Sequence, residues 1–104
     1  ASKDRLGANI APNVDVYRDV LVDRTIVEVR AADRLGLLHL IAKAIADCGL
    51  SIAFARVATE HGVANDVFHV ETANPEETFS PSGYLELRER LGKDLSAGKY
   101  HMKV

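Results

Sequence analysis

The segment 33–38 contains the residue types in this chain that could bind a small anion; its sequence is Asp33-Arg34-Leu35-Gly36-Leu37-Leu38. An apolar, β-branched segment precedes it, and apolar residues at helical spacing follow it. A turn from a strand into a helix leaves backbone N–H groups unpaired at the helix start, and these suit a carboxylate. We expect Asp33 either to cap the helix, accepting from the N–H of Leu35 or Gly36, or to accept from an ammonium group. Gly36 lacks a Cβ, so a ligand or a facing backbone can approach it closely.

The remaining reactive side chains predict neither a catalytic residue nor a metal site. The histidines stand at 39, 61, 69 and 101, with no pair at ligand spacing. Cys48 ends a helical pattern among apolar residues, which predicts a buried, inert thiol. Asp66 lies in the middle of an expected strand and is interpreted as solvated, with a dimer partner as the alternative. The chain has no glycine-rich phosphate loop, no nucleophile elbow and no catalytic pair of carboxylates, and we expect no cofactor.

Composition and charge exclude several classes of protein. The 104 residues are 47% hydrophobic and 27% charged, which is typical of one globular domain. A net charge of −2 gives no reason to expect a nucleic acid or a membrane as a partner. No apolar run is long enough for a membrane span. The single cysteine excludes an intrachain disulfide and is compatible with a reducing compartment, so we expect a cytoplasmic protein.

The hydrophobic pattern divides the chain into a flexible tail or linker at 1–12 and a single domain at 13–104. Strands are expected at 13–18, 25–30, 51–60 and 63–72, with a tight turn at His61-Gly62. Leu38, Ile41, Ala42, Ile45 and Cys48 predict one helix, which Gly49 ends. A second helix is expected to begin at Ser80 and Pro81 and to bury Leu87, Leu91 and Leu95. A last strand at 100–104 is also possible, so the fourth strand of the sheet comes either from 13–18 or from 100–104.

This order predicts an α+β fold with a ferredoxin-like βαββαβ plan. It is a two-layer sandwich in which two helices cover one face of an antiparallel four-stranded sheet. Such a sheet has one uncovered face and open edges, so a second copy is an expected partner. The plan does not by itself identify an activity.

Residues 24–95 resemble an ACT domain, the small ligand-sensing module of amino-acid metabolism. The resemblance rests on four segments in order: TIVEVR, DRLGLL, CGLSIAFARVAT and GVANDVFHV. The chain is most similar to the C-terminal ACT repeat of the bifunctional PII uridylyltransferase/uridylyl-removing enzymes of nitrogen regulation. The resemblance implies regulation of a longer enzyme by a free amino acid, with glutamine as the first expectation. It implies no catalysis by this chain itself.

The resemblance also assigns the ligand positions. They are Asp33, Leu35, Gly36, Leu37 and Leu38 in the turn, and Ser51 and Ile52 on the second strand of the motif, often contributed by a partner subunit or repeat. Two residues depart from the family pattern: Leu35 stands where proline is common, and Ser51 where asparagine is common. These departures favour the alternative of a free-standing ACT-fold dimerisation module with no bound ligand.

Overall fold

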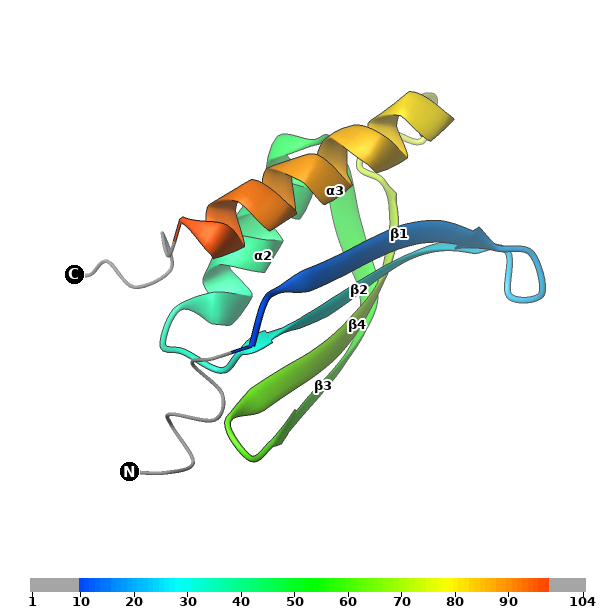
Figure 1. The fold of residues 1–104 in the computed structure, drawn as a ribbon. Helices are drawn as coiled ribbons and strands as arrows, with labels where there is room; N and C mark the ends of the chain where they lie inside the picture. The colour runs from blue at the N-terminus through cyan, green and yellow to red at the C-terminus, as the bar shows by residue number, and fades with distance from the viewer. Residues whose placement is uncertain (1–9, 98–104) are drawn as a thin grey trace.

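A computed structural model describes residues 10–97, which form four strands and two helices. In chain order these are β1 (Asn13–Asp19), β2 (Arg24–Ala32), α2 (Leu37–Asp47), β3 (Leu50–Glu60), β4 (Val63–Thr72) and α3 (Pro81–Ser96). The strands form one antiparallel sheet with the order β1-β2-β4-β3. Both helices lie on the same face of this sheet, and β3 forms one of its edges (Figure 1). The predicted α+β, ferredoxin-like sandwich is therefore confirmed.

The fourth strand comes from the N-terminal side of the chain. β1 forms a hairpin with β2, in a register that runs from Asn13 opposite Arg30 to Asp19 opposite Arg24. This strand takes the edge position beside β2, where the last strand of a βαββαβ fold would pair, so the described elements run in the order ββαββα. The alternative strand at 100–104 lies outside the described residues.

Two of the predicted turns depend on positive backbone φ angles. His61 and Gly62 join β3 to β4 with φ values of 55° and 77°, which fit the two-residue hairpin turn expected from the sequence. Gly49 ends the first helix segment with φ 78°. A residue with a Cβ pays a steric cost in this region, so glycine is favoured there.

The core lies between the helices and the covered face of the sheet. α3 buries Leu87, Leu91 and Leu95, as predicted, and the sheet contributes mainly Val27, Val29, Phe68 and Val70. α2 buries Leu37, Leu40, Ile41, Ala44 and Ile45. The expected stripe of Leu38, Ile41, Ala42, Ile45 and Cys48 is therefore confirmed at Ile41 and Ile45, but Leu37, Leu40 and Ala44 are buried as well and Leu38 is not. Leu38 is 47% exposed, because the helix starts with the side chain of Leu37 toward the sheet.

The start of α3 has the predicted cap. The Ser80 hydroxyl accepts a hydrogen bond from the Gly83 N–H at 3.3 Å, and Pro81 occupies the first helical position. The proline has no N–H to leave unpaired there, and its fixed φ suits a helix start. The loop at 73–80 is thus joined to the second helix in a defined conformation.

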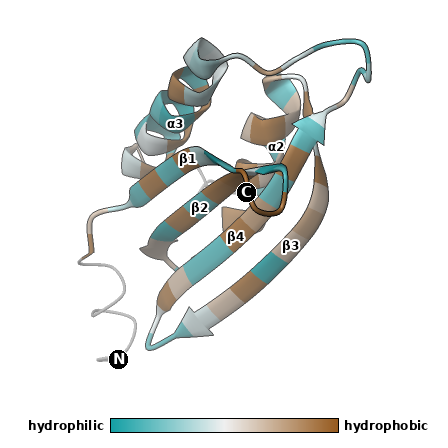
Figure 2. Cartoon of the chain, turned by 90° about the vertical axis from the view of Figure 1, so that its right-hand side faces the viewer, coloured by the Kyte–Doolittle hydropathy of each residue, from teal (hydrophilic) through white to brown (hydrophobic). Residues whose placement is uncertain are grey.

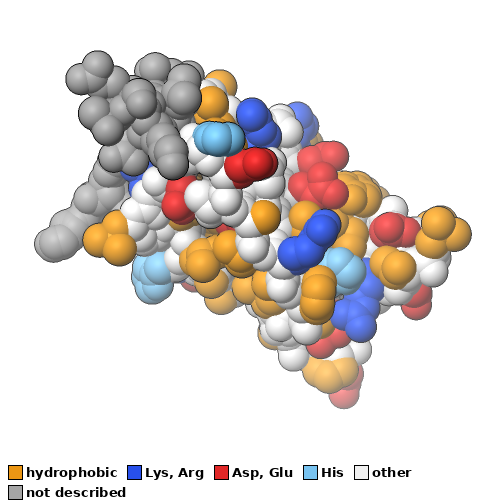
Figure 3. Space-filling model, turned by 90° about the horizontal axis from the view of Figure 1, so that it is seen from below, with side chains coloured by type: hydrophobic (Ala, Val, Ile, Leu, Met, Phe, Trp, Pro, Cys, Tyr) orange, Lys and Arg blue, Asp and Glu red, His pale blue; other side chains and the backbone are white. Residues whose placement is uncertain are grey.

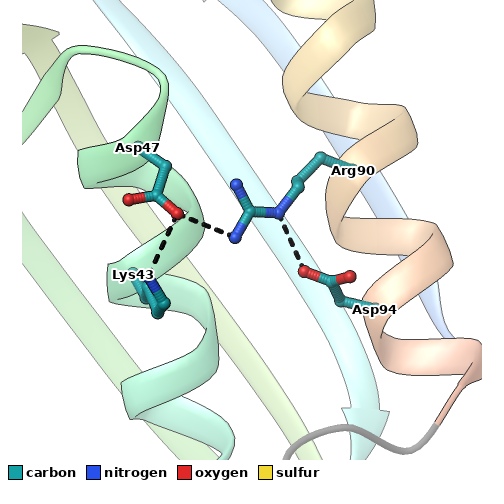
Figure 4. A network of polar contacts seen from close by, with 4 residues as sticks. All are labelled: Lys43, Asp47, Arg90 and Asp94. Atoms are coloured by element: carbon teal, nitrogen blue, oxygen red, sulfur yellow. Dashed lines mark hydrogen bonds and ion pairs between the residues drawn. The ribbon is translucent and has the colours of Figure 1, made fainter.

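Four charged side chains connect the two helices (Figure 4). Arg90 on α3 donates to Asp47 on α2 and to Asp94 on its own helix, each at 2.9 Å, and Lys43 lies 3.3 Å from Asp47. The hydrogen bonds from Arg90 and Lys43 lower the pKa of the Asp47 carboxyl. Most of this network is exposed, and exposed ion pairs contribute little to stability. Its stabilising effect therefore comes chiefly from the pair of Arg90 with Asp94, because Asp94 is buried.

Candidate functional site

The turn at 33–36 is fixed to one end of the sheet. The Asp33 N–H donates to the Gly62 carbonyl at 2.9 Å, so the turn lies beside the hairpin that joins β3 and β4. Asp33 continues the hydrogen bonding of β2 by one residue and its side chain is exposed. The sheet therefore positions the start of the turn, and the chain reverses into α2 within the next three residues.

The prediction that Asp33 caps the first helix is wrong. α2 begins at Leu37, and the capping position belongs to Gly36, whose φ is 89°, with no side-chain hydrogen bond. The Leu37 N–H instead bonds to the Arg34 carbonyl at 3.1 Å. Asp33 lies three residues before the capping position, because the turn continues through Arg34 and Leu35 to the left-handed Gly36 before the helix starts. Only glycine adopts this conformation without a steric cost.

The first turn of α2 presents unpaired backbone donors. Its first helical bond runs from the Leu40 N–H to the Gly36 carbonyl at 3.0 Å, and within the described residues the N–H groups of Leu38 and His39 have no backbone acceptor. A shallow hollow of about 520 Å³ lies here, lined by residues 33–39. Unpaired donors and the positive end of the helix dipole favour a small carboxylate at this place.

The apolar side chains of the turn divide into one core residue and two exposed ones. Leu37 is buried against the sheet. Leu35 is 96% exposed and Leu38 is 47% exposed, both lining the hollow. Exposed leucines at a turn of this kind suit contact with an apolar part of a ligand or with another protein surface. Leu35 also stands at the position where proline was the family expectation.

Ser51 and Ile52 lie far from this turn in the same chain. β3 runs from Leu50 beside the end of α2 to Glu60 beside the hairpin, so Ser51 is nine residues from the turn end of the strand. At about 3.3 Å per residue this separation is roughly 30 Å. The structure therefore brings together the turn residues 33–38 and leaves the two predicted facing residues at the opposite end of the sheet.

β3 is an open edge with apolar side chains. Of its eleven residues only Leu50 is buried, and Ile52, Phe54 and Val57 are large hydrophobic residues exposed on it. Figure 2 shows the strand at the outer side of the sheet with several apolar segments, and Figure 3 shows hydrophobic side chains mixed with charged ones on the lower side of the molecule. Phe54 contacts the His69 ring edge to face at 5.0 Å. Long apolar edges of this kind pair readily with another strand.

Asp66 is buried, contrary to the prediction of a solvated residue. It is 2% exposed, and its Oδ1 accepts from the Ala58 N–H at 3.3 Å while its Oδ2 has no partner among the described residues. Burial raises the pKa of the Asp66 carboxyl, and the nearby Asp33 carboxylate raises it further. The alternation of β4 indicates this burial, because Ala64, Asp66 and Phe68 lie on the same face of the strand.

The described part of the chain shows no arrangement of side chains suited to a metal site or to a nucleophilic cysteine. Residues 10–97 contain no cluster of three or more His, Cys, Asp or Glu side chains that would hold a metal ion. Cys48 is half-buried, and burial raises the pKa of its thiol, which disfavours the nucleophilic thiolate. None of the described helices combines the length and the apolar character needed to cross a membrane.

Comparison with known proteins finds several relatives that share one name. Bifunctional uridylyltransferase/uridylyl-removing enzymes match from Caulobacter vibrioides (strain NA1000 / CB15N), 44% identical over 61% of this chain, and from Pseudomonas syringae pv. tomato, 35% identical over 83%. The Azotobacter vinelandii enzyme is 33% identical over 89% of the chain. The chain spans only 7–10% of the length of these relatives. No family model and no solved structure matches the chain. By its sequence and its ferredoxin-like sheet, the chain is an ACT-like domain homologous to one part of the bifunctional uridylyltransferase/uridylyl-removing enzymes.

Proposed function

We propose that this chain is a regulatory domain that binds a free amino acid, glutamine first, and acts on a uridylyltransferase-like enzyme of nitrogen regulation. The observation that carries the proposal is the turn at 33–39, where unpaired N–H groups of Leu38 and His39 open onto a hollow. A free amino acid always offers a carboxylate to such donors. The exposed side chains of Leu35 and Leu38 supply an apolar rim for the rest of the ligand.

The site is completed by a second copy of the domain or by a second ACT repeat. If two β3 edges pair antiparallel about Ala55, the middle of the strand, Ser51 of the partner subunit lies opposite Thr59. Thr59 is next to the hairpin to which the turn is bonded. This pairing therefore carries the partner's Ser51 and the partner's Ile52 across the roughly 30 Å that separates them from the turn in one chain.

Regulation then follows from linkage. A ligand held between two domains binds the paired arrangement and has no complete site on separate domains, so it shifts the equilibrium toward pairing. In a longer enzyme, that shift changes the relative positions of the other domains that are joined to each ACT-like domain. This chain supplies the sensing step and contributes no catalytic group to the reaction of the parent.

The experiment is a thermal-shift and calorimetric screen of the twenty L-amino acids, with two matched glycine variants. Gly36→Ala and Gly49→Ala each place a Cβ at a positive φ, 89° and 78°, and each costs about 1–2 kcal/mol of stability. We expect only Gly36→Ala to remove the response, because Gly49 lies at the other end of α2. A dimeric wild-type sample that responds to no amino acid contradicts the proposal.

The alternative function is a dimerisation module with no bound ligand, and the apolar β3 edge favours it. Val57→Lys places a charge on this edge, whereas Leu85→Lys places one on an exposed position of α3. Both functions predict that only Val57→Lys lowers the molecular mass measured by light scattering. They differ in the ligand screen: the alternative predicts no melting shift with any amino acid.

A further inference from the structure

A cavity of about 390 Å³ lies at the end of the sheet where Leu50 pairs with Thr72, opposite to the turn at 33–36. Residues from all four strands, from the loop before α3 and from α3 itself line it. The start of α3 and the turn that joins β1 to β2 lie at this same end (Figure 1). The hollow at 33–39, by contrast, is lined by one continuous segment. Side chains from several elements therefore converge on the cavity, as they do in sites for small molecules.

Two hydroxyl groups stand in the cavity above an apolar floor. The floor is formed by Leu50 and Val70, which are buried. Thr25 is only 5% exposed, and its hydroxyl lies 3.2 Å from that of Tyr84. Packing alone would be served as well by valine, the residue that β2 has at its next position on this face, Val27. Each hydroxyl carries one hydrogen and their mutual bond uses one, so the pair keeps an O–H donor for a third group.

The wall on the α3 side is in place without a ligand. The rings of Phe79 and Tyr84 lie 5.0 Å apart between centroids, and Phe79 packs against the core. Gly83 makes room for this ring, because a Cβ there would lie 2.7 Å from the Phe79 Cε1 atom. The Ser80 cap fixes the residues between them. A wall that needs no rearrangement lowers the cost of binding.

The cavity also contains a guanidinium group without an acceptor. Arg24 is half-buried and has no hydrogen-bond or ion-pair partner among the described residues. Its neighbour in the register is Asp19, whose carboxylate instead accepts from the Leu21 N–H at 3.0 Å. The other guanidinium of the lining, that of Arg18, is paired with Asp23. Arg24 is therefore the cation that is available to an anionic group in the cavity.

Two carboxylates line the same cavity. Glu71 and Glu77 are exposed, and neither has a partner within residues 10–97. They would repel a ligand that carries only negative charge, and Arg24 would repel one that carries only positive charge. A zwitterion satisfies both sides, with a carboxylate for the guanidinium and an ammonium group for the carboxylates.

We propose that this cavity is a second binding site, which takes a small zwitterion of the α-amino acid class. Arg24 and the hydroxyl pair of Thr25 and Tyr84 hold the carboxylate of the ligand, Glu71 and Glu77 face its ammonium group, and its side chain lies on the apolar floor. The site is complete within one domain. It lies about 30 Å from the turn at 33–36, the length of β4, and does not depend on that turn.

The test compares Arg24→Gln with Arg30→Gln in the full 104-residue chain. Arg30 is an exposed arginine of the same strand that does not line the cavity. Isothermal calorimetry measures the L-amino acids one at a time, and each acid that binds is measured again without its amino group. We expect Arg24→Gln to weaken affinity by about ten- to a hundredfold, the range of a charge-assisted hydrogen bond. Arg30→Gln is expected to leave affinity within about threefold.

Amide chemical shifts of the wild-type protein locate the ligand without any variant. Shifts at Thr25, Thr72 and Tyr84 that persist in Gly36→Ala support the cavity and overturn the turn as the place of binding. Shifts confined to residues 33–39, with undiminished binding by Arg24→Gln, overturn the cavity and leave the proposed function intact. Equal binding of the acid without its amino group overturns the zwitterion. If no amino acid binds the wild-type chain, the cavity site and the proposed function both fail.

Discussion

Replacing Asp66 by asparagine is expected to stabilise the unliganded domain at neutral pH. The buried carboxylate has one hydrogen bond, from the Ala58 N–H, and an unpaired Oδ2. An unsatisfied buried polar group costs about 1–3 kcal/mol, and more when it is charged. The asparagine oxygen keeps the bond to Ala58, and its neutral amide group still lacks an acceptor. We therefore expect a gain near the lower end of that range, about 1 kcal/mol in the free energy of unfolding.

The pH dependence of this gain has a definite sign. Burial and the Asp33 charge raise the pKa of Asp66 in the folded state above its unfolded value of 3.8. Between these two pKa values the folded state binds more protons, so the stability of the wild type increases as pH falls. The advantage of Asp66→Asn is therefore complete above the raised folded-state pKa and is lost as pH falls through that pKa toward 3.8.

Urea unfolding at pH 7 and pH 4 measures this difference, with Asp33→Asn as the exposed control. We expect the control to change stability by less than about 0.5 kcal/mol at either pH, as is usual for a surface substitution. An Asp66→Asn protein that is less stable than wild type at pH 7 refutes the reasoning. It would mean that the ionised carboxylate is satisfied in the free domain.

Three further substitutions, two of them with a matched control, test the core packing, one helix cap and the charged network between the helices. Leu91→Ala removes a fully buried side chain of α3 and is expected to lower the free energy of unfolding by about 2–5 kcal/mol. Leu85→Ala, on the exposed side of the same helix, is expected to lower it by less than about 0.5 kcal/mol. Equal losses in urea unfolding would contradict the assignment of the core face. Ser80→Ala removes the helix cap and is expected to cost about 1 kcal/mol, read as a lower melting temperature; an unchanged melting temperature would show that the cap contributes nothing. Arg90→Ala leaves the buried Asp94 without one of its partners and is expected to lower the free energy of unfolding by about 1–2 kcal/mol. Lys43→Ala is expected to lower it by less than about 0.5 kcal/mol, because the Lys43–Asp47 pair is exposed. A larger loss in Lys43→Ala than in Arg90→Ala in urea unfolding would contradict this description of the network.

The fold was largely predictable because its elements carry strong local signals. Strand alternation, the positive φ required at Gly49 and Gly62, and the Ser80 cap each point to one local structure, and the structure agrees with them. The source of the fourth strand was not decidable from the pattern, since two short segments had the same alternation. Its place beside β2 depends on tertiary pairing, which a local pattern does not encode.

The site was less predictable, because it depends on the backbone conformation of the turn at 33–36 and on which face of β4 a charged residue occupies. Asp33 matched a capping residue by type, but the left-handed Gly36 moved the helix start to Leu37. Asp66 matched a solvated residue by charge, and only its alternation with Ala64 and Phe68 indicated burial. Residue type predicts the average environment of a side chain, so it fails where a site places a charge against that average.

The roughly 30 Å between Ser51 and the turn has a consequence for how ligand binding is measured. If the two predicted halves of the site meet only when two β3 edges pair, one domain alone presents an incomplete site. Apparent affinity must then increase with protein concentration, because pairing and binding are linked equilibria. A variant that blocks pairing, such as Val57→Lys, must also lose ligand affinity although Val57 lies outside the turn. An affinity that is independent of protein concentration would place the whole site within one domain, and would leave Ser51 and Ile52 without a role in it.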